Sequence, residues 1–283
     1  MTEILETPAL QRLRERRLRI LITNDDGINA PGMACLQKIA AAICDDVWVV
    51  APESEQSGAS HSLTLHIPIR LRQTGPRSFA VLGTPTDCVM MGVKRIIPHY
   101  AKADGDTRQP DLVLSGVNRG SNIADDVTYS GTVAGAMEGC ALGIPSIALS
   151  QSFGRSGDEA RWSVAQHHGP ALIARLLEAG WPADVLLNVN FPDVPYLQVD
   201  RIEVTSQGRR DSHGTVIIAR EDARGIPYYW LGFEFTHSDP PSGTDMHALR
   251  QGSISVTPLH LNLTHDGAIR RLRELVSASP LEE

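Results

Sequence analysis

The stretch Leu18-Arg19-Ile20-Leu21-Ile22-Thr23-Asn24-Asp25-Asp26-Gly27 decides how the rest of the chain is interpreted. Its apolar, partly β-branched residues predict a short buried strand, and the hydrophobic pattern stops at Asn24. The adjacent carboxylates Asp25 and Asp26 repel one another and are costly to bury unless a cation lies between them. Gly27 permits the turn that both side chains need in order to reach one ion. The alternative is a solvated Asp-Asp-Gly turn, and residues further along the chain bear on the choice.

Buried apolar runs alternate with helical patterns after this stretch. After the first strand at 18–22, strands are predicted at 47–51, 111–115, 145–150 and 185–191, with extended segments at 63–71 and 78–82 that are expected to leave the main sheet. Helices are predicted at 33–43, 88–97, 133–140 and 160–179. The helix at 133–140 is rich in small residues and can therefore pack closely on a sheet. Strand-helix-strand units at this spacing form parallel sheets with right-handed crossovers, so the sequence predicts an α/β fold with an open, mostly parallel sheet.

The pattern changes near the C-terminus. Strands at 216–219 and 228–235 flank a Gly-containing turn, and a strand at 252–258 and an amphipathic helix at 267–277 follow. Exposed hairpins and terminal helices are easily shared between protomers, so we expect a homo-oligomer. We divide the chain into an N-terminal extension (1–17), a core (18–205) and a β-hairpin and C-terminal helix extension (206–283).

Composition excludes several classes of protein. The 283 residues are 42% hydrophobic and 21% charged, which is ordinary for a globular protein. The net charge of −7 argues against a duplex nucleic-acid binder, and no apolar run approaches the ~20 residues that span a bilayer. The four cysteines have no zinc-type spacing and indicate reduced thiols of a cytoplasmic protein. The Arg-rich first 17 residues contain no apolar signal region and are expected to be a mobile or helical extension.

Oxygen-bearing side chains follow three of the predicted strands, at the point where each strand ends. They are Asp25 and Asp26, then Ser57, then Asn118. Because ligands of open parallel sheets bind outside the carboxyl ends of the strands, we expect these side chains to share one site. Two carboxylates, a hydroxyl and an amide are hard oxygen donors, which favour Mg²⁺ or Mn²⁺, or Ca²⁺, over zinc or copper.

A second feature, Ser130-Gly131-Thr132, precedes the small-residue helix. Its hydroxyls and backbone N–H groups can hold an anion, although a plain helix N-cap explains the same residues. A metal ion beside an anion-binding site can catalyse the hydrolysis of a phosphoester. Arg119 either meets a phosphate or forms a surface salt bridge, and His61 and the His237–His247 region are expected to be loop or packing histidines. There is no P-loop sequence and no G-x-G-x-x-G after the first strand.

Several motifs together resemble those of the stationary-phase survival protein SurE family of 5'-nucleotidases, in the right order over roughly residues 18 to 265. They are Thr23-Asn24-Asp25-Asp26-Gly27, Ala30-Pro31-Gly32, Val50-Ala51-Pro52, Ser57-Gly58-Ala59-Ser60, Gly83-Thr84-Pro85-Thr86-Asp87, Ser115-Gly116-Val117-Asn118-Arg119-Gly120, Tyr129-Ser130-Gly131-Thr132-Val133 and Ser255-Val256-Thr257-Pro258-Leu259. The Arg-rich start lies outside the family pattern.

The resemblance implies a Rossmann-like three-layer αβα core with a swapped C-terminal extension, forming homodimers or homotetramers. It also implies hydrolysis of nucleoside 5'-monophosphates with one divalent metal per subunit, with 3'-monophosphates and short polyphosphate as further substrates. The implied metal ligands are Asp25, Asp26, Ser57 and Asn118. The two carboxylates are the expected catalytic residues, and Ser130, Gly131 and Thr132 are expected around the phosphate. Either an activated water attacks phosphorus, or one Asp acts as base or nucleophile.

Two other functions fit parts of the sequence. A non-catalytic module that senses nucleoside monophosphates through its oligomer interface would use the same pocket. A sugar-nucleotide transferase would also use an acidic metal motif, but the adjacent Asp pair lacks the usual spaced D-x-D form.

Overall fold

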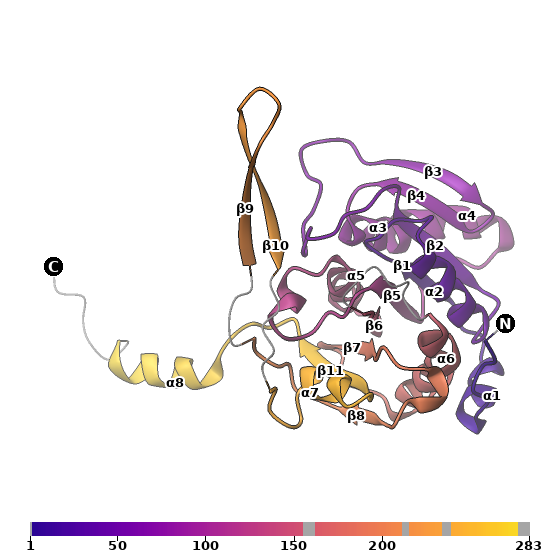
Figure 1. Ribbon diagram of the computed structural model, residues 1–283. Helices are drawn as coiled ribbons and strands as arrows, with labels where there is room; N and C mark the ends of the chain where they lie inside the picture. The colour runs from indigo at the N-terminus through magenta and orange to yellow at the C-terminus, as the bar shows by residue number, and fades with distance from the viewer. Residues whose placement is uncertain (1, 155–161, 211–214, 234–238, 277–283) are drawn as a thin grey trace.

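A nine-stranded sheet forms the centre of the computed structural model, which describes residues 2–154, 162–210, 215–233 and 239–276. The strands of this sheet are β1 (Ile20–Thr23), β2 (Val47–Pro52), β3 (Arg70–Gly75), β4 (Ser78–Leu82), β5 (Leu112–Arg119), β6 (Ser146–Gln151), β7 (Val185–Phe191), β8 (Ile202–Val204) and β11 (Ile254–His260). Their order is β3-β4-β2-β1-β5-β6-β7-β11-β8 (Figure 1). The six strands from β4 to β7 in this order, which include β2 and β1, are parallel to one another. Within this sheet, β3 pairs antiparallel with β4, and β11 pairs antiparallel with β7. The predicted α/β fold with a mostly parallel sheet is confirmed.

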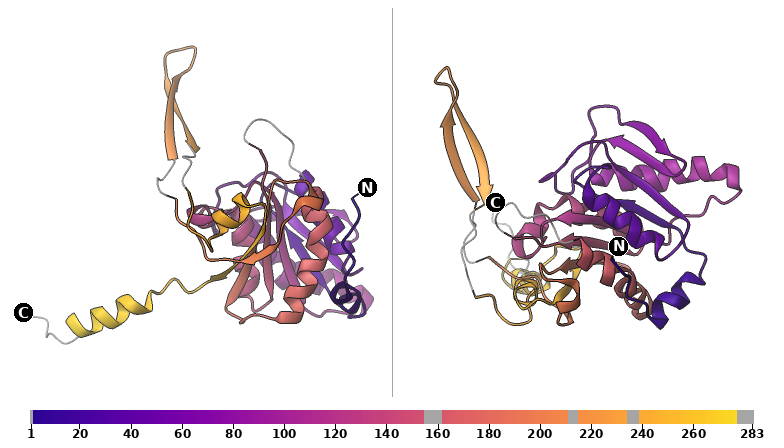
Figure 2. Two further views of the ribbon diagram at one scale, coloured as in Figure 1. Left: turned by 60° about the horizontal axis from the view of Figure 1, so that its bottom comes forward. Right: turned by 45° about the vertical axis from the view of Figure 1, so that its right-hand side comes forward.

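Helices cover both faces of the sheet, as the two views of Figure 2 also show. One face carries α1 (Pro8–Arg14), α2 (Pro31–Ala41) and α6 (Ser163–Ala179). The other carries α3 (Pro85–Met91), the π-helical turn η1 (Gly92–Ile96), α4 (Ile97–Tyr100) and α5 (Gly131–Ala141). Short elements complete the body: η2 (Ala101–Asp104), η3 (Ala124–Thr128), η4 (Tyr196–Gln198) and α7 (Asp245–Arg250).

The central strand β1 is buried on both faces. Ile20 and Ile22 pack in the cluster beneath α2, whereas Leu21 packs in the cluster on the opposite face. This alternation explains why the strand reads as a continuous apolar run. On the second face, α5 packs closely on the sheet because glycine faces it: a Cβ on Gly135 would lie 2.6 Å from Ser115 Oγ. The close packing predicted for this small-residue helix is confirmed.

The N-terminal extension is helical where α1 forms. Thr7 caps the helix through its side chain, and Leu10 and Leu13 are buried in the main core cluster. Arg12 pairs with Glu178 of α6 at 2.7 Å. The helix therefore packs on α6 as part of the body.

The predicted elements need five corrections. The two extended segments were expected to leave the main sheet, but β3 and β4 belong to it because β4 pairs with β2. The segment 63–71 is not a strand throughout, since β3 begins only at Arg70. Before that residue the chain is held by side-chain hydrogen bonds, such as the one from Thr64 Oγ1 to Asp87 Oδ2. Strand β5 continues past Ser115 to Arg119, because after an irregularity its last residues pair again with β6. The helix predicted at 88–97 begins at Pro85, where Thr84 and Asp87 form a capping box. The edge strand β8 was not predicted, since only three residues pair there.

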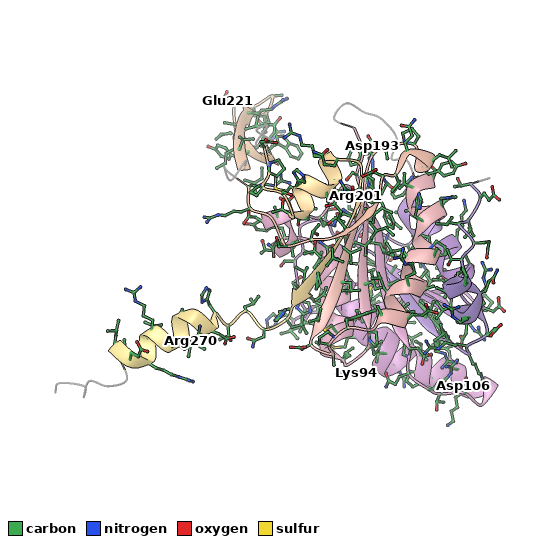
Figure 3. The ribbon with its side chains drawn as sticks, turned by 90° about the horizontal axis from the view of Figure 1, so that it is seen from below. Lys94, Asp106, Asp193, Arg201, Glu221 and Arg270 are labelled. Carbon is green, nitrogen blue, oxygen red and sulfur yellow. The ribbon has the colours of Figure 1, made fainter. Side chains whose placement is uncertain are left out.

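The C-terminal extension projects from the body (Figure 1). Strands β9 (Thr215–Glu221) and β10 (Pro227–Phe233) form the predicted hairpin, and α8 (Asp266–Leu275) follows β11. Glu221 on the hairpin and Arg270 on α8 both stand clear of the body in Figure 3. The predicted ends of β10 at 235, of α8 at 277 and the start of α6 at 160 fall outside the described residues. The cysteines are free, three of them buried, and no helix in the described part of the chain is long and apolar enough to cross a membrane.

Candidate functional site

The acidic corner is a tight turn at the end of β1. Asn24 Nδ2 donates to the carbonyl of Gly27 at 2.9 Å, and Gly27 has a φ of 101°, which an L side chain rarely adopts. Asp25 is only 4% exposed, whereas Asp26 is half-buried. The turn therefore places two carboxylates together, one of them almost out of reach of water.

The loop after β2 is tied to this corner by backbone hydrogen bonds. Ile28 N donates to the carbonyl of Pro52 and Gln56 N to the carbonyl of Asp25, both at 2.8 Å. Ser57 follows directly and is exposed, with its Oγ donating to Glu55 Oε1 at 2.9 Å. The structure thus brings Ser57 into the same cleft as the Asp pair.

The end of β5 supplies the third part of the site. Asn118 Nδ2 donates to the carbonyl of Gly120 at 3.0 Å, which leaves Asn118 Oδ1 as the amide atom available to a cation. The backbone N–H of Arg119 donates to Asp26 Oδ2 at 3.3 Å. Strand β5 lies next to β1, and so Asn118 and Asp26 meet at one edge of the sheet.

The N-terminus of α5 packs against Asp25. The Thr132 hydroxyl donates to Asp25 Oδ1, and a Cβ on Gly131 would lie 2.7 Å from Asp25 Cβ. Ser130 lines the cleft, and its Oγ accepts the N–H of Val133 as a helix cap at 3.0 Å. Of the three residues predicted around a phosphate, Ser130 is thus at the cleft wall, whereas Gly131 and Thr132 are buried against Asp25.

All of these elements border one open cleft of about 1410 Å³. Its lining includes all four predicted metal ligands and Tyr129 of the motif that begins there, and also Asn29, Glu53, Glu55, Phe153, Trp162 and Arg210, which the sequence did not single out. Burial raises the pKa of Asp25 to about 6 because the charged form is desolvated; the hydrogen bond from Thr132 opposes this shift and the charge of Asp26 adds to it. Burial also raises the pKa of Asp26.

The donor atoms at this corner fit a hard cation. Two carboxylates, one amide oxygen and one hydroxyl are present, and a positive charge would relieve the desolvation of the Asp pair. Within the described ranges, no three His, Cys, Asp or Glu side chains are grouped as a metal site. A cation here would therefore depend on mixed oxygen donors and would keep open positions for water or a substrate oxygen.

One wall of the cleft is held by the segments on either side of the hairpin. Asp245 accepts the N–H groups of Ala124 and Gly208, at 2.9 and 2.8 Å. Arg210 binds Asp126 through two guanidinium nitrogens, one of them Nε at 3.0 Å from Oδ1. Arg210 lies far along the chain from the cleft motifs, so no local sequence signal could have assigned it to this wall.

The other residues that the sequence singled out have definite surroundings. His61 Nε2 lies 3.1 Å from Glu138 Oε2 of α5 and fixes the loop that carries Ser57. His247 Nδ1 is 3.2 Å from the carbonyl of Pro240, and His237 is outside the described residues. The guanidinium of Arg119 lies over the ring of Phe153, 5.0 Å from its centroid, and forms no salt bridge with the residues that the structure describes.

The fold and the cleft define the class of protein: a Rossmann-like α/β protein with an oxygen-rich cleft at the carboxyl ends of its parallel strands. The family model described as Survival protein SurE matches residues 20–214, and the chain belongs to the SurE family. A protein of Parvibaculum lavamentivorans named 5'-nucleotidase SurE is 55% identical over 260 residues, covering 92% of this chain and 91% of that protein. A protein of Caulobacter vibrioides with the same name is 56% identical over 265 residues, covering 93% and 98%.

A solved structure agrees with the sequence comparisons. The crystal structure of the SurE protein from Aquifex aeolicus matches with a TM-score of 0.74 and 38% identity. The match covers 91% of this chain and 99% of the Aquifex chain. The resemblance inferred from the motifs is therefore confirmed.

Proposed function

We infer that this protein is a 5'-nucleotidase, a phosphoric monoester hydrolase that converts nucleoside 5'-monophosphates to nucleoside and phosphate. The observation that carries this proposal is the meeting of Asp25, Asp26, Ser57 and Asn118 in one cleft beside the N-terminus of α5. The printed names of the related proteins support the same substrate class.

Asp25, Asp26, Ser57 and Asn118 would hold one divalent cation, Mg²⁺ or Mn²⁺, with Ca²⁺ as a non-physiological substitute. Such a cation stabilises phosphoryl oxygens and acidifies a water. The chain's own residues prepare the site for it. Thr132 fixes the direction of the Asp25 carboxylate, and the amide of Arg119 does the same for Asp26.

The phosphate would be bound by Ser130-Gly131-Thr132 at the start of α5. The first turn of a helix favours an anion through its free N–H groups and its dipole. Ser130 would face the phosphate, whereas Gly131 allows the helix to approach Asp25 closely enough for phosphate and carboxylate to share one cation.

Phosphate release from AMP tests the proposal directly. We expect release with Mn²⁺ or Mg²⁺, loss of release with EDTA, and recovery when the metal is returned. Tight AMP binding without phosphate release at any metal would instead support the non-catalytic sensing module. A panel with 3'-AMP, short polyphosphate and a sugar nucleotide tests the remaining substrates.

The projecting hairpin and α8 would join protomers into a homodimer or homotetramer, with residues 206–283 as the oligomerising extension of a core at 18–205. Exposed apolar side chains on the hairpin, such as Trp230 at 60% and Leu231 at 76%, support this proposal. The free, mostly buried cysteines support a cytoplasmic location. Sedimentation of the intact chain tests the oligomer.

A further inference from the structure

Phe153 is an apolar ring placed at the cleft rather than in the core. It follows β6, and the preceding Ser152 N–H donates to the carbonyl of Phe191 at 2.9 Å, which fixes the backbone beside it. The residue is 37% exposed and lines the same cleft as the Asp pair. An exposed aromatic side chain inside an open cleft loses hydrophobic stabilisation unless a ligand covers it.

The ring lies close to a predicted metal ligand. A Cβ placed on Gly120 would be 3.5 Å from Phe153 Cε1 and 3.8 Å from Asn118 Nδ2, so that a single glycine separates the ring from the amide. A phosphate held near Asn118 and Asp26 would therefore have the ring within the reach of the nucleoside attached to it.

Arg119 links the two parts of this arrangement. Its backbone N–H binds Asp26, and its guanidinium lies 5.0 Å from the centroid of the Phe153 ring. The guanidinium covers one face of the ring, so a base would stack on the outer face of the guanidinium or on the face of the ring that Arg119 leaves uncovered. Nucleobases stack on both kinds of surface, and such stacking tolerates any base because every base has a π-face.

We propose that Phe153 and Arg119 form the platform on which the base of the nucleotide substrate stacks. The proposal rests on the inferred 5'-nucleotidase function and adds the residues that distinguish a nucleotide from a simpler phosphate ester. Phe153 supplies the apolar face, and Arg119 supplies the planar cation while its backbone holds Asp26.

The test compares two substrates that share the same phosphate and sugar. AMP carries a base and ribose 5-phosphate does not, so the ratio of their kcat/KM values measures recognition of the base. We expect this ratio to fall about tenfold in Phe153→Leu, which keeps apolar volume but loses the ring. Phe153→Tyr keeps the ring and should keep the ratio.

Tyr129 provides a matched control, because it is a second exposed aromatic side chain among the described residues of the cleft, at 59%, and does not lie beneath Arg119 in the described contacts. Tyr129→Leu should change the AMP to ribose 5-phosphate ratio less than Phe153→Leu does. As a second measurement, the inhibition constant of adenosine against ribose 5-phosphate hydrolysis should rise in Phe153→Leu.

The outcomes separate this inference from the proposed function. Equal losses on both substrates in Phe153→Leu would show a structural role and overturn the platform. An unchanged ratio, or a larger effect of Tyr129→Leu, would overturn it as well while leaving nucleotidase activity established. Absence of AMP hydrolysis by the wild-type protein would overturn both.

Discussion

The hydroxyl of Thr132, in the first turn of α5, donates a hydrogen bond to the Asp25 carboxylate at the end of β1. Thr132 is fully buried, so this bond is shielded from water. It joins the helix that would bind phosphate to the carboxylate that would bind metal. The backbone of Thr132 belongs to the helix turn proposed to bind the phosphate, while its hydroxyl is directed at Asp25.

Removing this hydroxyl should weaken the metal site. Thr132→Val keeps the shape of the side chain but leaves Asp25 without the bond that opposes the rise of its pKa, so the carboxylate should ionise at higher pH. Loss of a partner that orients a metal ligand costs about 10- to 100-fold in affinity or activity. Titration of AMP hydrolysis with Mn²⁺ at several pH values measures both effects. Thr132→Ser, which keeps the hydroxyl, should stay close to wild type.

Asp26→Asn should abolish most turnover without unfolding the protein. Asp26 is half-buried at the cleft, and losing its charge removes a ligand without removing volume. We expect a fall in kcat of at least about 100-fold, typical of groups that stabilise charge at a reacting centre. Asp45→Asn, an exposed carboxylate remote from the cleft, is the control and should be active. Near-normal activity of Asp26→Asn with metal still bound would contradict the site.

The contribution of Asp25 to the stability of the metal-free protein should fall as pH rises. The pKa of Asp25 is raised from 3.8 to about 6, so the folded state binds its proton more tightly than the unfolded chain. The contribution of this group to the free energy of unfolding is therefore greatest below about pH 4 and falls as pH rises to about 6. Asp25→Asn removes the penalty. In EDTA, the free energy of unfolding of this variant minus that of wild type should therefore be about 3 kcal/mol larger at about pH 7.5 than at about pH 4.

Urea unfolding of both proteins at the two pH values measures this difference. A constant difference across the pH range would show that Asp25 does not titrate in the predicted direction. Saturating Mn²⁺ should stabilise the wild type more than Asp25→Asn, because only the wild type has both carboxylates.

Helix α1 should contribute to stability although it precedes the residues matched to the family. Leu10 is fully buried between α1 and the body, and Leu→Ala at such sites costs about 2–5 kcal/mol. Leu5→Ala is the matched control: Leu5 is 39% exposed, and the variant should cost much less. Equal unfolding midpoints for Leu10→Ala and wild type would mean that α1 does not pack on α6 in solution.

The sequence predicted the parts of the molecule that are governed by local pattern. Buried runs such as β1 and the close-packed α5 follow from residue type and spacing, and the shared edge of parallel strands predicted that Asp25, Ser57 and Asn118 would meet. The segment 63–71 was mispredicted because Leu63, Leu65 and Ile67 alternate as in a strand, yet all three side chains are exposed.

Residues positioned by distant contacts escaped prediction. Phe153 follows β6 as an apolar residue that no pattern distinguishes from a core residue, and only its exposure and its contact with Arg119 reveal a different role. Arg210 reaches Asp126 across a sequence separation of 84 residues. Such pairings depend on how whole segments pack, which single-sequence periodicity does not encode.

The hydrogen bonds of Arg210 and Asp245 have a practical consequence for protein engineering. Both residues flank the hairpin segment and are bonded to the cleft wall, whereas the turn between β9 and β10 lies at the far end of the hairpin (Figure 1). Exposed turn tips with small and polar residues tolerate insertions. An affinity tag or fluorescent peptide inserted at Asp222–Gly225 would therefore lie at the tip of the hairpin, while Arg210 and Asp245 stay bonded to the cleft wall.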